Sequence, residues 1–134
     1  MQKLVETMFK HDLDEVEPKE EVLSKMRQGE KRELTNEQFQ TAAFLAKSLS
    51  DENRLRILHF ISDGKKSVGS IVEGLNLSQP LVSHHLKELK RSLLVSVERS
   101  GPFIYYELSD QRVMDVVGVL EAIAADLLSA RRTF

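Results

Sequence analysis

The order of local patterns between residues 67 and 108 constrains the fold of this chain more than any other feature. Ser67–Leu75 carries apolar residues at helical spacing. A turn of about three residues then leads into a second helical pattern, which Ser78 can cap and which holds Pro80 in its first turn, where a missing N–H costs little. Val95–Arg99 and Phe103–Leu108 are rich in branched and aromatic residues and flank a Ser-Gly-Pro turn sequence. The sequence therefore predicts two helices joined by a tight turn and followed by a β-hairpin.

Further helical patterns flank this region. Thr35 and Gln38 resemble a capping box that opens one helix, and Asp51 can cap a second. Ser109 or Asp110 can cap a long final helix, whose apolar stripe is wider than a lone surface helix needs. We predict a mainly α (α+β) fold class, a winged helix-turn-helix with a two-stranded β-hairpin wing.

The second helix of the motif has an apolar face and a polar face. With Val82, Leu86 and Leu89 buried, the opposite face offers short polar and basic side chains, as a helix in the major groove of DNA requires. Gln suits an adenine edge, Lys suits guanine or phosphate, and the helix N-terminus offers N–H groups to a phosphate. One arginine at the start of the hairpin is placed for a minor groove or a phosphate. The predicted DNA-binding residues are Ser78, Gln79, Pro80, Ser83, His84, Lys87, Arg91 and Arg99.

The same residues permit a plainer interpretation. The polar row is equally the solvated face of a surface helix, and Arg99 is equally an ordinary solvated arginine. The hairpin behind the helix favours DNA binding, because helix, turn, helix and two strands in this order are an unusual coincidence in a domain without that function. A winged-helix module that binds protein stays open as an alternative, since the net charge of -2 permits it.

Composition limits the remaining classes of function. A length of 134 residues suits one hydrophobic core and hence a single domain. The chain has no cysteine, which excludes disulfides, thiolate metal sites and thiol redox sensing by its own residues. No apolar run is long enough to cross a bilayer, and the first ten residues lack the apolar region of a secretory signal. We therefore expect no membrane partner and a cytoplasmic location.

The region from Leu49 to Asp110, about half of the chain, resembles the ArsR/SmtB family of bacterial winged-helix repressors. The resemblance implies a homodimer that binds an inverted-repeat operator in double-stranded DNA and represses transcription until an unidentified small-molecule effector releases it. It also implies that the first and last helices form the dimer interface. The motifs that carry it are Ser50–Asp51 with Arg54–Leu58, Leu77–Pro80 running into Val82–Lys87, and Tyr105–Leu108.

The resemblance divides the single domain into three parts. They are a charged N-terminal helical extension at residues 1–34, a DNA-binding core at residues 35–109 and a dimerisation helix at residues 110–134. The terminal helices are accordingly expected to be dimerisation helices. The predicted interface residues of the last helix are Val113, Val116, Val117, Leu120, Ile123 and Leu127.

The chain departs from the family where many members bind metals. Where many members have a Cys-x-Cys pair, this chain has Lys66–Ser70, without cysteine. Other members form a zinc site on the last helix, and here that helix has no histidine. We therefore predict a repressor that lacks the cysteine and histidine metal sites of the family. The alternative is a repressor that responds to a metal or small molecule through a site without cysteine.

Two other clusters are weaker candidates for a site. His84 and His85 with Glu88 form a conceivable metal patch, although consecutive histidines point about 100° apart on a helix. His11 lies among acidic residues that suit either a cation or a solvated acidic helix. Phosphate loops, nucleophile elbows and His–acid pairs with a nucleophile are lacking. We predict no metal site, no cofactor, no catalytic residue and no enzyme activity.

Overall fold

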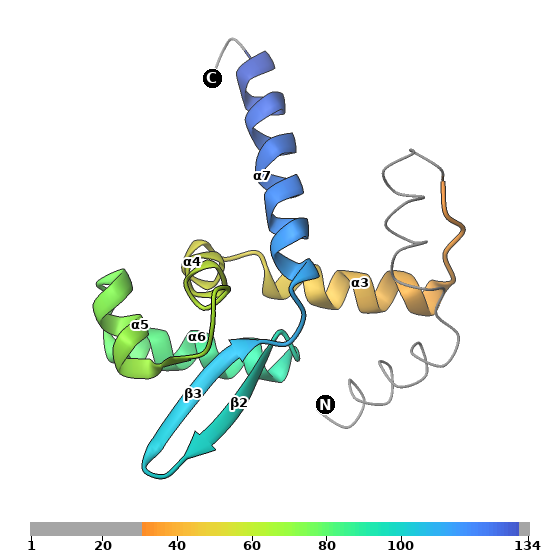
Figure 1. The fold of residues 1–134 in the computed structure, drawn as a ribbon. Helices are drawn as coiled ribbons and strands as arrows, with labels where there is room; N and C mark the ends of the chain where they lie inside the picture. The colour runs from red at the N-terminus through yellow and green to blue at the C-terminus, as the bar shows by residue number, and fades with distance from the viewer. Residues whose placement is uncertain (1–30, 132–134) are drawn as a thin grey trace. The chain divides into compact units, whose positions relative to one another are not determined.

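The computed structural model describes residues 31–131, and these belong to two compact units that meet at Lys47 and Ser48. The predicted extension at residues 1–34 therefore lies largely outside the described residues. His11 and its acidic neighbours lie wholly outside them. Figure 1 labels the helices and the two longer strands of the described residues. In chain order the elements are α3 (Asn36–Ser48), α4 (Glu52–Phe60), β1 (Lys66–Ser67), α5 (Val68–Leu75), α6 (Gln79–Arg91), β2 (Val95–Ser100), β3 (Phe103–Leu108) and α7 (Arg112–Ala130).

The first unit contains α3, which begins at the predicted capping box. The Thr35 N–H donates to Gln38 Oε1 at 2.9 Å, and the Gln38 N–H donates to Thr35 Oγ1 at 3.2 Å. These two bonds satisfy N–H groups that a helix start leaves without partners. The prediction of a helix that starts here is confirmed.

The core of the second unit lies where α4, α5 and α6 meet. Ile57, Leu58, Ile71, Val82 and Leu89 are fully buried. Each contributes about 1.5–3 kcal/mol to folding by leaving water. Three short helices thus depend on one another, because helices of this length are marginal in isolation.

The wing is a hairpin of β2 and β3, as predicted, and a short third strand joins it. β2 and β3 pair in register from Val95 opposite Leu108 to Ser100 opposite Phe103, and β1 pairs with the other edge of β3. The sheet therefore has three antiparallel strands, where the sequence predicted two. β1 is only two residues long, so its pattern was too short to read as a strand.

The turn between α5 and α6 has the predicted length of about three residues. Asn76 adopts the left-handed conformation (φ 53°) that ends α5, and Asn tolerates that region better than most residues. Gly74 lies before this turn, inside α5. A Cβ at Gly74 would lie 2.3 Å from the ring of Phe60, so the glycine permits α4 and α5 to pack closely.

α7 leaves the end of β3 and, in Figure 1, runs away from the hairpin. The N-cap of α7 is Gln111, not Ser109 or Asp110 as predicted, although the carboxylate of Asp110 accepts from the Arg112 N–H at 2.9 Å. Among the described elements of the second unit, only α4 makes more than slight contact with α7, and residues 121–130 are all exposed. Within the described residues, no helix has the length and apolar content to span a membrane.

We predict that Gly74→Ala destabilises the protein by about 1–3 kcal/mol, because the new methyl group must displace the Phe60 ring. Gly69→Ala in the same helix is the matched control, since its nearest atom is Ser67 Oγ at 3.9 Å. We expect Gly69→Ala to be neutral or stabilising by up to about 1 kcal/mol. Urea unfolding measures both changes, and equal effects would contradict the packing argument.

Candidate nucleic-acid interface

α6 begins in the manner that its sequence predicts. Ser78 is the N-cap, and its Oγ accepts a hydrogen bond from the Leu81 N–H at 3.3 Å. Pro80 sits in the first turn. Backbone N–H groups at this exposed end carry the partial positive charge of a helix N-terminus, which favours an anion.

The two faces of α6 differ sharply in exposure. Val82, Leu86 and Leu89 are at most 1% exposed and pack into the core. Gln79, Ser83 and Lys87 follow one another at intervals of four residues, and each is exposed. The sequence therefore folds α6 with its apolar stripe inward and its polar row outward.

The eight residues predicted to bind DNA are all exposed in the second unit. Seven of them belong to α6 or its N-cap, and Arg99 belongs to β2. Within residues 31–131, Lys87 and Arg99 have no hydrogen bond or ion pair, so both cations are available to a ligand. Arg91 instead lies 3.1 Å from Glu88 Oε1 in an ion pair, which a phosphate would have to replace.

The wing carries mixed charge. Arg99 lies opposite Ile104 in the register, two residues before the positive-φ Gly101 of the turn. Glu98 on the other face is paired with Lys65, whose Nζ lies 2.8 Å from Glu98 Oε2. This pairing raises the pKa of Lys65 and neutralises a carboxylate that would otherwise repel phosphate.

A polar cluster around the buried His85 lies behind α6. His85 is only 4% exposed, and its Nδ1 accepts a hydrogen bond from Arg54 Nε at 3.3 Å. Its Nε2 lies 3.7 Å from Asp51 Oδ1. His85 is thus a packing and hydrogen-bonding residue, and its two partners were not predicted. Sequence spacing gave no sign of them, because 31 positions separate Arg54 from His85.

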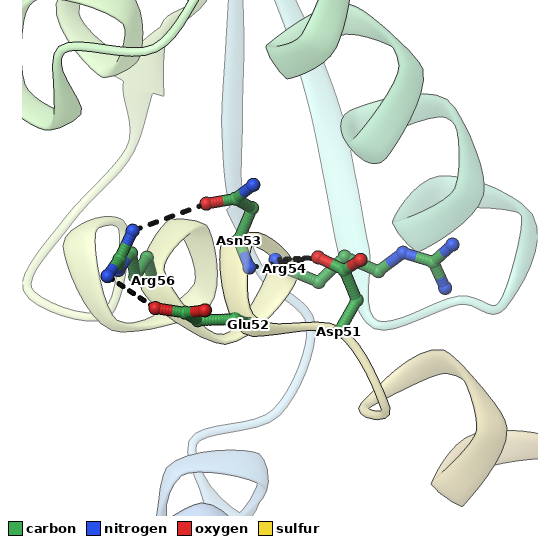
Figure 2. Close-up of polar contacts among 5 residues, drawn as sticks. All are labelled: Asp51, Glu52, Asn53, Arg54 and Arg56. Atoms are coloured by element: carbon green, nitrogen blue, oxygen red, sulfur yellow. Dashed lines mark hydrogen bonds and ion pairs between the residues drawn. The ribbon is translucent and has the colours of Figure 1, made fainter.

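Figure 2 shows how the start of α4 supplies both partners. Asp51 Oδ1 accepts from the N–H groups of Asn53 at 2.8 Å and Arg54 at 3.1 Å, which caps the helix. The Arg54 side chain extends away from α4, while Arg56 lies on the other side and pairs with Glu52. The hydrogen bond from the Arg54 N–H is the largest cause that lowers the pKa of Asp51, so this carboxylate stays ionised.

The apolar side chains of α7 lie largely in solvent. Of the six predicted interface residues, Val113 and Val117 are half-buried, and Val116, Leu120, Ile123 and Leu127 are about half or more exposed. Val119 and Leu128 are also exposed, although neither was among the predicted interface residues. The described residues contain no group of three or more His, Asp or Glu placed to hold a metal ion.

The sequence model of the bacterial regulatory protein, arsR family, matches residues 51–97. The transcriptional repressor SdpR of Bacillus subtilis is 39% identical over 71 residues, which cover 53% of this chain and 79% of that protein. A probable mercury resistance operon repressor of Streptomyces lividans is 38% identical over 90 residues, which cover 67% of this chain and 72% of that protein. The residues that the family model matches include the capped α4, both helices of the turn motif and the start of the wing.

A solved structure agrees with this fold. HlyU from Vibrio cholerae superposes with a TM-score of 0.60 at 31% identity, over 66% of this chain and 97% of that one. The winged helix-turn-helix that the sequence predicted is thus confirmed for the second unit.

We predict that Leu86→Ala and Lys87→Ala, two neighbours on α6, affect stability very differently. Leu86 is 1% exposed, and its truncation should cost about 2–5 kcal/mol of unfolding free energy. Lys87 is exposed and without a partner in residues 31–131, so its truncation should change stability by less than about 0.5 kcal/mol. Denaturant unfolding of both variants tests this, and a large loss for Lys87→Ala would show that Lys87 serves the fold.

Proposed function

Because this chain belongs to the ArsR family of bacterial regulatory proteins, we propose that it is a dimeric, sequence-specific DNA-binding repressor of transcription. One observation carries the proposal. The polar row of α6 is exposed while the opposite side of the same helix is fully buried. A helix held in this way presents a rigid edge to the major groove, because the core fixes its orientation.

Each of the eight predicted DNA-binding residues has a role in this proposal. Gln79 and Ser83 read base edges, where an amide suits adenine, and Lys87 contacts guanine or a phosphate. Ser78 and Pro80 place the N-terminus of α6 against a phosphate, and His84 and Arg91 add contacts along the helix. Arg99 reaches from the wing into the adjacent minor groove.

We propose that two copies of the chain associate through α7. Val116, Leu120, Ile123 and Leu127 expose a continuous apolar stripe that water covers in the single chain. Val119 and Leu128 widen the stripe. Pairing of this helix with its copy would bury the stripe and set two α6 helices on an inverted-repeat operator.

We propose that release of this repressor from DNA differs from that of metal sensors with thiolate sites. The relative from Streptomyces lividans is named as a mercury resistance repressor, and this chain has no cysteine with which to hold a soft metal. We propose that the protein lacks the cysteine and histidine metal sites of such sensors and that an effector of another class releases it. The proposed function is binding, without catalysis, in the cytoplasm where its DNA lies.

We predict that Lys87→Ala weakens binding to all duplexes, because it removes a cation that faces phosphate. The slope of log affinity against log salt concentration should become shallower by about one, since about one counterion fewer is released on binding. Gln79→Ala should instead relax discrimination between sequences, with a cost of about 1–3 kcal/mol at one base pair. Fluorescence anisotropy against duplexes selected from a random pool, at several salt concentrations, measures both effects.

Lys47→Ala is the matched control for that experiment, because it removes one charge from α3, outside the proposed interface. It should leave the salt slope within error of the parent. Parent-like binding by both Lys87→Ala and Gln79→Ala would contradict the proposed face. A parent that binds no duplex would favour the alternative of a module that binds protein.

We predict that Ile123→Asp abolishes the dimer, because a charge would be buried in the apolar seam of α7. Asp126→Ala on the same helix is the control and should leave the dimer intact. Analytical ultracentrifugation distinguishes monomer from dimer, and circular dichroism verifies that the helices persist. A dimer of unchanged affinity in Ile123→Asp would place the interface elsewhere.

A further inference from the structure

His85 is a polar side chain in the core of a domain whose other deeply buried side chains are mostly apolar. It lies on α6 and is 4% exposed, with Leu86 beside it in the core. Its two ring nitrogens both face the start of α4. A buried imidazole costs free energy unless its partners compensate, so the pair on α4 gives this histidine a defined place.

The partners select one protonation state. Arg54 Nε carries a hydrogen and donates it to His85 Nδ1 at 3.3 Å, so that nitrogen carries none. The remaining proton sits on Nε2, which faces the carboxylate of Asp51 at 3.7 Å. A second proton would put an N–H of the ring against the N–H of Arg54 and add a positive charge beside a guanidinium. This hydrogen bond therefore requires the neutral ring.

The charges around the ring oppose its protonation on balance. Burial lowers the pKa of His85 most, Asp51 raises it, and Arg54 and His84 lower it further. α5 and β2 also pack on α6, and their charged residues, Glu73 in α5 and Glu98 and Arg99 in β2, are exposed and do not shift this pKa.

The neighbouring histidine differs from His85 in burial. His84 is exposed on the proposed DNA face, and its ring centroid lies 5.4 Å from that of His85. Protonation of His85 would remove the hydrogen bond that ties α6 to α4. Of the two adjacent histidines, only the buried one holds α6 on α4.

We propose that His85 is a positioning residue for DNA binding, which fixes α6 on the start of α4 through Arg54 and Asp51 only while its ring is neutral. This inference rests on the proposed function. Protonation of His85 on acidification would then release DNA without any bound effector. Asp51 is well placed for this role, since the same carboxylate oxygen caps α4 and faces the ring.

DNA affinity as a function of pH tests the proposal, from about pH 8 to about pH 5, where histidine titrates. The affinity of the parent should fall by up to about tenfold per pH unit and per protomer once the pH is below the lowered pKa of His85. His84→Gln removes the other imidazole of α6 and should retain this fall. His85→Gln keeps an acceptor for Arg54 that does not titrate and should lack the fall.

Nuclear magnetic resonance of the parent chain supplies a readout that needs no variant. We expect His85 to be the Nε2–H tautomer, to titrate below the ordinary value of 6.5, and to shift the amide signals of α6 and of Arg54 with the same midpoint. Titration at the ordinary value without these shifts would overturn the proposal, even if His85→Gln failed to fold.

The outcomes separate this inference from the function on which it rests. No binding by the parent at about pH 7.5, where His85 is neutral, would overturn the proposed function. If the parent binds DNA, two results would overturn the role of His85 alone. One is a DNA affinity of His84→Gln that does not change with pH. The other is a DNA affinity of His85→Gln that changes with pH as that of the parent does.

Discussion

Val82, Leu86 and Leu89 anchor α6 in the core, and the proposed function depends on that burial. Together the three side chains contribute several kcal/mol, at about 1.5–3 kcal/mol each. That sum is a large part of the stability of a small domain. One face of the helix is buried in the core, so the opposite face is not needed for packing. That face carries its amide, hydroxyl and ammonium groups at fixed intervals. A looser helix would bind DNA with a larger loss of entropy.

Features encoded by neighbouring residues were predictable from the sequence. The capping box at Thr35, the caps Asp51 and Ser78, and the hairpin of β2 and β3 depend on residues at most a few positions apart, and all of them form. Features that join distant segments were not predictable in this way. β1 exists because it pairs with β3 about forty positions later, and Gly74 is needed because α5 crosses the ring of Phe60. For the candidate site, exposure of the polar row followed from helical spacing, whereas the contact of Arg54 with His85 did not.

The distribution of charge explains how a chain of net charge -2 can bind DNA. Two acidic groups near the proposed interface, Glu88 and Glu98, are each engaged with a cation in the single chain. Lys87 and Arg99 have no such engagement in residues 31–131. The local field at α6 and the wing is therefore more positive than the sum over the chain suggests. α7 carries the complementary feature, an apolar stripe whose exposure is hard to explain in a protein that works alone.

Hydrogen–deuterium exchange of the protein, free and bound to a duplex selected from a random pool, tests whether α6 and the wing contact DNA. If they do, binding slows exchange at the first turn of α6 and along the hairpin of β2 and β3, and leaves the amides of α5 unchanged. Protection confined to α7 or to α3, with the first turn of α6 exchanging as in the free protein, would contradict this contact.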